Sequence, residues 1–214
     1  MTGLAWALIV LAAVIAVVDW VAVGTGNLRL EYVAKPATMV PLIAAAAIID
    51  AVRPDQTVWF VAALVCSLAG DVFLMLPNSE RWFVPGLGSF LIGHLAYIVG
   101  LVVGGIDTGP LLVGIVLVIG GLALVAPRIV RGAAATDRRL GPPVLAYISV
   151  ISIMVAFAIG TTLPLAIAGA LAFYLSDACI GWSRFVAEFP RSRLAIITTY
   201  HAAQLLLVLS LATG

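Results

Sequence analysis

Long apolar runs, separated by short polar segments, extend along almost the whole chain. A helix that crosses a lipid bilayer needs about 20 predominantly apolar residues, within a range of about 17–25. Eight segments satisfy this requirement, near 4–23, 36–52, 58–76, 88–106, 110–126, 142–159, 163–182 and 194–212. The pattern predicts an all-α integral membrane protein in which residues 1–214 form a single domain, a bundle of eight transmembrane helices.

Prolines mark several of the predicted helix ends. Proline is tolerated in the first turn of a helix, where its missing N–H has no intrahelical partner. Four prolines fall at or near predicted starts: Pro36, Pro110, Pro142 and Pro164. Pro77 and Pro127 follow predicted ends, so that 127–141 becomes the longest and most basic loop. We interpret this loop as a determinant of topology, and no linker is long enough to separate domains.

The composition agrees with a membrane protein and excludes other classes. Hydrophobic residues make up 64% of the chain, charged residues make up 10%, and the mean hydropathy is +1.21. Soluble domains carry about 25% charged residues, so a soluble globular domain and a disordered chain are both excluded. The net charge of +1 gives no basic surface for nucleic acid. Cys66 and Cys179 lie inside apolar runs, which favours packing over a disulfide.

The basic residues predict the orientation of the chain. Eight spans place both termini on one side of the membrane. Of the eleven Lys and Arg residues, all except Arg53 fall in the loops that follow the first, third, fifth and seventh spans. Short loops rich in Lys and Arg stay in the cytoplasm. The sequence therefore predicts a multi-pass protein of the cell (inner) membrane, with both termini outside the cytoplasm and the first span retained as a helix.

Ionisable residues occur inside the predicted spans, where they are costly. An aspartate at the centre of a membrane helix costs about 2.5–3.5 kcal/mol, and such residues usually face the bundle interior. Five lie within spans: Asp19, Asp71, His94, Asp177 and His201. The predicted topology places all five at similar depth in the cytoplasmic half, and Glu31, Lys35 and Tyr147 approach from the same side. We therefore expect one polar cavity that is reached from the cytoplasm or the inner leaflet.

Two segments of the chain resemble each other. Ser67-Leu-Ala-Gly-Asp71 is similar to Tyr174-Leu-Ser-Asp177. His94 follows Asp71 by 23 residues, and His201 follows Asp177 by 24. A four-helix unit repeated in the same orientation, a four-plus-four parallel repeat, would give this pattern. The site would then lie between the two halves, as it does in transporters with parallel repeats.

Paired carboxylates in a dry cavity favour acid/base chemistry. One carboxyl group can stay protonated while a better solvated one stays ionised, and this division of roles drives hydrolysis through oxocarbenium-like states. A vinyl ether breaks in a similar way, through a proton added to carbon and an attack by water. The chain has no HExxH, no CxxC pair and no GxSxG elbow. A zinc site that uses both histidines and both aspartates stays an alternative.

Five segments, in family order, carry a resemblance to the YhhN family of integral membrane lysoplasmalogenases. They are Lys35-Pro-Ala-Thr38, Ser67-Leu-Ala-Gly-Asp71-Val-Phe-Leu, Gly88-Ser-Phe-Leu-Ile-Gly-His94-Leu-Ala-Tyr97, Tyr174-Leu-Ser-Asp177 and Tyr200-His-Ala-Ala-Gln204. The resemblance implies an eight-helix membrane fold and an ether hydrolase without a cofactor. It implies cleavage of the vinyl ether bond of lysoplasmalogens to a fatty aldehyde and glycerophosphocholine or glycerophosphoethanolamine.

The resemblance also implies site residues and a partner. Asp71 and Asp177 are the expected acid/base pair, with side chains within about 8 Å of each other, as in two-carboxylate glycosidases. Residues expected to orient water or hold the phosphate are Lys35, His94 and Tyr97, followed by Glu31, Tyr200, His201 and Gln204. The expected partners are a lysophospholipid from the cytoplasmic leaflet and membrane lipids; the sequence gives no oligomeric state and does not assign acid and base.

Two other functions fit the same residues. A membrane transporter or carrier of a small polar or lipid substrate would need a cavity that reaches both sides and broken helices near the midplane. A hydrolase of another lysolipid, with or without a metal ion, would use the same scaffold on a different bond. A bound metal near His94 or His201 would favour the metal-assisted form.

Overall fold

The computed structural model describes residues 2–77 and 79–213, and this part of the chain is helical without any β-strand. Its eight α-helices are α1 (Gly3–Thr25), α2 (Leu28–Ile48), α3 (Thr57–Met75), α4 (Ser79–Val103), α5 (Thr108–Thr136), α6 (Gly141–Gly160), α7 (Pro164–Phe185) and α8 (Ser192–Ser210). Two short 3₁₀ turns, η1 (Pro54–Gln56) and η2 (Arg138–Leu140), precede α3 and α6. The predicted all-α bundle is confirmed.

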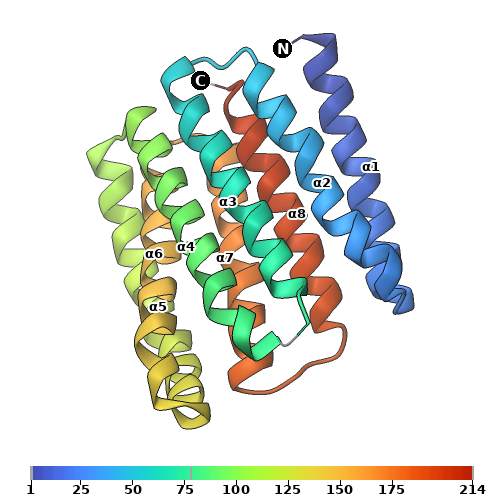
Figure 1. Cartoon of the computed structure of the whole chain (residues 1–214). Coiled ribbons are helices and arrows are strands. Elements are labelled where there is room, and N and C mark those ends of the chain that lie inside the picture. The colour runs from blue at the N-terminus through green and yellow to red at the C-terminus, as the bar shows by residue number, and fades with distance from the viewer. Residues whose placement is uncertain (1, 78, 214) are drawn as a thin grey trace.

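The helices stand side by side, and both ends of the chain lie at the same end of the bundle (Figure 1). The turns that follow α1, α3, α5 and α7 lie at the other end (Figure 1). We call that end the basic end, because these turns and the adjoining helix termini carry ten of the eleven Lys and Arg residues. This arrangement agrees with an even number of antiparallel helices.

Seven of the eight helices are long and apolar enough to cross a membrane. The exception is α2, whose first part carries Arg29, Glu31 and Lys35, so its crossing stays a prediction. The outer surface of the bundle is apolar: Val116 and Leu124 on α5 leave 70% and 69% of their surfaces exposed. Apolar surface on this scale needs a lipid environment rather than water. The chain is therefore a multi-pass membrane protein.

Several predicted helix boundaries are wrong, because prolines lie inside helices rather than at their ends. α2 begins at Leu28, where Asn27 caps it by accepting the Leu30 N–H at 3.2 Å, and it continues through Pro36. α4 likewise begins at Ser79 and contains Pro85. Within a membrane bundle, neighbouring helices and local adjustments compensate the backbone hydrogen bond that a proline removes.

The predicted basic loop at 127–141 is also wrong. α5 continues through Pro127 to Thr136, and η2 occupies most of the remainder. Beyond the proline, Ile129 and Ala133 are buried against Val144 of α6. This packing offsets the missing backbone hydrogen bond and keeps the segment helical.

Consecutive helices pair as hairpins, and the buried side chains form two separate apolar clusters. Close pairs are α1 with α2, α3 with α4, α5 with α6, and α7 with α8. Glycines permit some of these approaches: a Cβ atom at Gly169 of α7 would lie 2.8 Å from the Leu207 side chain of α8. The main cluster includes Phe60, Phe90 and Phe173. A smaller second cluster, centred on Ile129, Ala133 and Val144, joins α5 to α6.

Candidate active site

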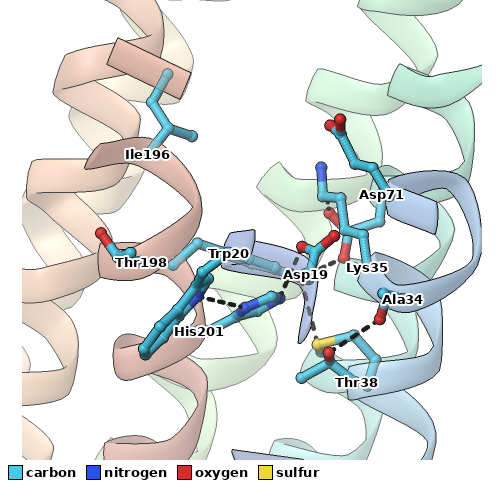
Figure 2. A network of polar contacts seen from close by, with 12 residues as sticks. Asp19, Trp20, Ala34, Lys35, Thr38, Asp71, Ile196, Thr198 and His201 are labelled. Atoms are coloured by element: carbon cyan, nitrogen blue, oxygen red, sulfur yellow. Dashed lines mark hydrogen bonds and ion pairs between the residues drawn. The ribbon is translucent and has the colours of Figure 1, made fainter. Parts of the chain in front are cut away.

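Asp71 is held between a lysine and a tyrosine that come from two other helices. It is fully buried on α3. Lys35 of α2 places its Nζ atom 3.1 Å from Asp71 Oδ1, and the two side chains point toward each other in Figure 2. The hydroxyl of Tyr200 on α8 donates to Asp71 Oδ2 at 2.6 Å. Asp71 therefore has both a cationic partner and a hydrogen-bond donor.

Asp177, on α7, has neutral or titratable partners instead of a lysine. The hydroxyl of Tyr147 on α6 donates to Asp177 Oδ2 at 2.8 Å. The Nε2 atom of His94 on α4 lies 3.5 Å from the same oxygen. In the described part of the chain no lysine or arginine forms an ion pair with Asp177. The two aspartates are thus electrostatically different.

The partners of the two aspartates follow one order in the bundle. Asp71 on α3 is contacted from α2 and α8. Asp177 on α7 is contacted from α6 and α4. The Asp71 set is thus α3, α2 and α8, and the Asp177 set is α7, α6 and α4. Each helix of the second set lies four helices after its counterpart in the first set, if counting continues from α8 to α1. This order agrees with the expected four-plus-four parallel repeat, which stays a prediction.

Both aspartates line one small cavity, which we call the aspartate cavity. Its volume is about 30 Å³, and its polar lining includes Lys35, Asp71, Ser176, Asp177 and Tyr200. A cavity needs roughly 10–15 Å³ to hold a water molecule. The aspartate cavity can therefore hold a water molecule, and the expected separation of about 8 Å between the two carboxyl groups stays a prediction.

A larger cavity of about 550 Å³, which we call the vestibule, adjoins the aspartate cavity. The two share Lys35, Leu74, Ile180, Ile196 and Ile197. The vestibule lies between the first turns of α2, α4 and α8 and the last turns of α7, which is the basic end of the bundle. Its charged lining comprises Glu31, Lys35, Arg184, Glu188 and Arg193. Of the five ionisable residues expected to share one cavity, Asp71 and Asp177 line the aspartate cavity, which adjoins the basic end through the vestibule, whereas Asp19, His94 and His201 line neither cavity.

Glu31 belongs to the vestibule rather than to the aspartate cavity. Arg193 of α8 donates from one nitrogen to both carboxylate oxygens of Glu31, at 2.8 and 2.6 Å. Lys35, one helical turn further along α2, lines both cavities. The four-residue spacing of Glu31 and Lys35 thus puts one side chain in the vestibule and the other at its junction with the aspartate cavity.

His201 lies in a second buried cluster beside Lys35 (Figure 2). The indole N–H of Trp20 donates to His201 Nδ1 at 3.1 Å, so the imidazole proton is on Nε2. That nitrogen lies 3.9 Å from Asp19 Oδ2. Asp19 is fully buried. His94 lies beside Asp177, whereas His201 lies beside Asp19. The two histidines, Asp71 and Asp177 therefore do not converge as the zinc-ligand set considered above.

Tyr97 and Gln204 lie outside the aspartate cavity. The Tyr97 hydroxyl donates to Gln204 Oε1, and both side chains are fully buried. Neither residue lines the aspartate cavity or the vestibule. Tyr97 also packs edge-on against Phe60 in the main apolar cluster. Their hydrogen bond links α4 to α8 inside the bundle.

Two residues that contact the site are absent from the predicted set. Tyr147 supplies the hydrogen bond to Asp177, and Arg193 pairs with Glu31. The sequence places Tyr147 on the same side of the membrane as the aspartates, but its spacing does not indicate a partner 30 residues later. For Arg193 the sequence predicts a role in topology and no contact with Glu31.

Comparisons with known proteins point to one family. The sequence profile of the YhhN family matches residues 30–211. Lysoplasmalogenase TMEM86B of Homo sapiens is 35% identical over 150 residues, which cover 69% of this chain and 61% of the human protein, less than two thirds of its length. Lysoplasmalogenase of Mycobacterium bovis is 32% identical over 186 residues, covering 86% of this chain and 70% of that protein. No solved structure matches significantly. Because the family profile covers most of the chain, this protein belongs to the YhhN family.

Proposed function

We propose that this protein hydrolyses the vinyl ether bond of lysoplasmalogens, releasing a fatty aldehyde and glycerophosphocholine or glycerophosphoethanolamine. The names of its relatives support this substrate class. The observation that carries the proposal is that Asp71 and Asp177 line one water-sized cavity while differing in their charge partners. Hydrolysis through an oxocarbenium ion needs such a pair, one carboxylic acid and one carboxylate.

Asp177 is the general acid in this proposal. An ionised carboxylate without a cation is costly in a medium of low dielectric constant, so a group that receives only the Tyr147 hydrogen bond is favoured in its neutral form. Asp177 gives its proton to the alkene carbon that does not bear the ether oxygen. The carbon bonded to that oxygen then becomes an oxocarbenium ion.

Asp71 is the general base, because Lys35 supports its negative charge. It accepts a proton from the water in the aspartate cavity as the water oxygen bonds to the oxocarbenium carbon. The hemiacetal then collapses: its hydroxyl proton passes to the glycerol oxygen as the carbon–oxygen bond to glycerol breaks, and the aldehyde and the alcohol leave. The proton taken up by Asp71 returns to Asp177 through the next water, so each cycle consumes one water molecule.

The neighbouring side chains act as positioning residues. Lys35 and Tyr200 orient Asp71, and Tyr147 and His94 orient Asp177. In the vestibule, arginines can attract the substrate phosphate, and Glu31 or Glu188 can attract an ammonium head group. The charge bias of the loops supports a basic end in the cytoplasm. The substrate would then come from the cytoplasmic leaflet of the inner membrane, with both termini of the chain outside.

The proposed reaction is tested with purified protein in detergent and three lysolipids that differ only in the chain linkage. The vinyl ether lysolipid should release aldehyde, whereas the saturated alkyl ether should not react. In heavy water, immediate reduction of the product should give an alcohol with one deuterium on carbon 2, because the proton added there comes from an exchangeable acid. Fatty acid released from the acyl lysolipid, without any aldehyde from the vinyl ether, would identify a hydrolase of another lysolipid instead.

A further inference from the structure

A third cavity, which we call the slot, lies between α5, α6 and α7. Most of its lining is aliphatic, including Ala126 and Ile129 of α5 and Ile148 and Ile151 of α6. The described lining contains one carboxyl group, that of Asp177, to which the hydroxyl of Tyr147 donates. The slot is therefore an apolar cavity whose wall includes one member of the aspartate pair, between Tyr174 and Gly181 on α7.

Asp177 joins the slot to the polar cavities. It lines the slot and the aspartate cavity, and the aspartate cavity shares its outer lining with the vestibule. A ligand that occupied these cavities would place a charged group in the vestibule and an apolar group in the slot. The bond that connects these two groups would lie beside Asp177. An amphiphile with one hydrocarbon chain has that order of groups.

We propose that the slot is the binding subsite for the hydrocarbon chain of the lysolipid substrate, an inference that rests on the function proposed above. The chain occupies the slot, the vinyl ether lies beside Asp177, and the phosphate-bearing head group lies in the vestibule. The slot thereby aligns the alkene carbon with the acid that protonates it, which is a positioning effect.

The depth of the slot agrees with this orientation. On α6 it extends from Val144 to Ile151, and on α7 from Gly181 back to Tyr174, roughly 10 Å along each helix axis. On α7 the vestibule is lined by Ile180, Ser183 and Arg184, so it overlaps the end of the slot and continues nearer to the basic end. A lysolipid in the leaflet at that end points its chain in the same direction, toward the bilayer centre.

The slot also lies at the boundary between the two apolar clusters. Tyr147 and Ile151 belong to the main cluster, whereas Ile129 and Val144 belong to the second. The volume of the slot is about 40 Å³, so a long hydrocarbon chain that enters here has to move the two clusters apart. Val125 and Ile148 are half-buried, so the edge of the slot meets the lipid phase from which the chain would enter.

A second apolar groove reaches Tyr147 but does not have the same connection. It lies between α4 and α6 and includes Leu87, Leu91 and Ala146. Neither aspartate is part of its lining. The slot is therefore favoured as the chain subsite, and the α4–α6 groove supplies a control.

Three alanine-to-leucine variants of the purified protein test the subsite. Ala126→Leu narrows the deep end of the slot, Ala146→Leu fills the α4–α6 groove, and Ala123→Leu adds the same atoms to the exposed face of α5. For a long-chain substrate, kcat/KM should fall about tenfold in Ala126→Leu and stay within about twofold in the other two. For a substrate whose chain is too short to reach Ala126, kcat/KM should be the same in Ala126→Leu as in the unmodified protein. Equal effects in Ala126→Leu and Ala123→Leu, or a larger effect in Ala146→Leu, would overturn the proposal.

Photo-crosslinking separates a failure of the subsite from a failure of the reaction. The probe is a saturated alkyl-ether lysophosphoethanolamine with a diazirine on its chain, which needs no hydrolysis to report its position. Adducts should map to the slot residues of α5, α6 and α7 and should be displaced by excess unlabelled alkyl-ether lipid. If such adducts form but no aldehyde is released from the vinyl ether substrate, the proposed subsite is supported and the proposed hydrolysis is refuted. Aldehyde release with adducts in the α4–α6 groove, or scattered over the outer surface, would refute the subsite alone.

Discussion

Lys35 reaches from α2 to within 3.1 Å of Asp71 on α3, inside the helix bundle. Only 18% of the lysine side chain is exposed, and it lines both the vestibule and the aspartate cavity. Lys35 is therefore the counter-ion of Asp71 and also lies at the junction of the two cavities. The corresponding position beside Asp177 is occupied by the hydroxyl of Tyr147.

Removal of Lys35 should destabilise the protein more than removal of both charges. Lys35→Met leaves Asp71 buried without a cation, at a cost of about 3–5 kcal/mol in the free energy of unfolding. The double variant Lys35→Met with Asp71→Asn should recover most of that loss, yet remain inactive. Thermal unfolding of the purified proteins in detergent, together with aldehyde release, measures both effects. A double variant as unstable as Lys35→Met would argue against the ion pair.

The two tyrosines should differ in their contribution to stability. A hydrogen bond to an ionised carboxylate is roughly twice as strong as one to a neutral group. Tyr200→Phe should therefore lower the unfolding temperature more than Tyr147→Phe, while both lower kcat. Tyr32→Phe, at an exposed position, is the matched control. Equal losses of stability in the two buried variants would contradict different ionisation states for Asp71 and Asp177.

Asp19 provides a test of which buried carboxyl groups take part in the reaction. Neither of its oxygens has a hydrogen-bond partner within the described residues, and Asp19 does not line the aspartate cavity. Asp19→Asn should therefore keep activity within about threefold and maintain or raise stability, because it removes a buried carboxyl group whose oxygens accept no hydrogen bond. A loss of kcat comparable to that of Asp177→Asn would mean that the Asp19–His201 pair belongs to the catalytic machinery.

The orientation in the membrane can be tested by labelling with a maleimide that does not cross membranes. Asp55 lies near the end that holds both termini, and Ala187 lies at the basic end; both are exposed. Asp55→Cys should label in intact cells, and Ala187→Cys only after permeabilisation. The native cysteines are partly buried within α3 and α7, and the unmodified protein gives their background. The reverse pattern would place the basic end, and substrate entry, outside the cytoplasm.

The helix bundle could be predicted from the sequence because the length of an apolar run is a local property. The ionisable residues within those runs also indicated a shared cavity, and Asp71 and Asp177 do line one. The predicted helix boundaries are wrong at Pro36 and Pro127, because packing against neighbouring helices outweighs the tendency of proline to end a helix. The partnership of Tyr147 with Asp177 depends on how α6 and α7 rotate against each other, and hydropathy carries no information about that rotation.

Aldehyde release by conservative aspartate variants is the most direct test of the proposed acid/base pair. The unmodified protein, Asp71→Asn, Asp177→Asn and the exposed control Asp55→Asn should be compared on a vinyl ether lysolipid, with folding checked by thermal unfolding. Loss of a general acid or base should reduce kcat by about 10²–10⁴-fold in Asp71→Asn and in Asp177→Asn, with Asp55→Asn unchanged. Folded Asp71→Asn or Asp177→Asn protein that releases aldehyde as fast as Asp55→Asn would contradict the assignment of the pair.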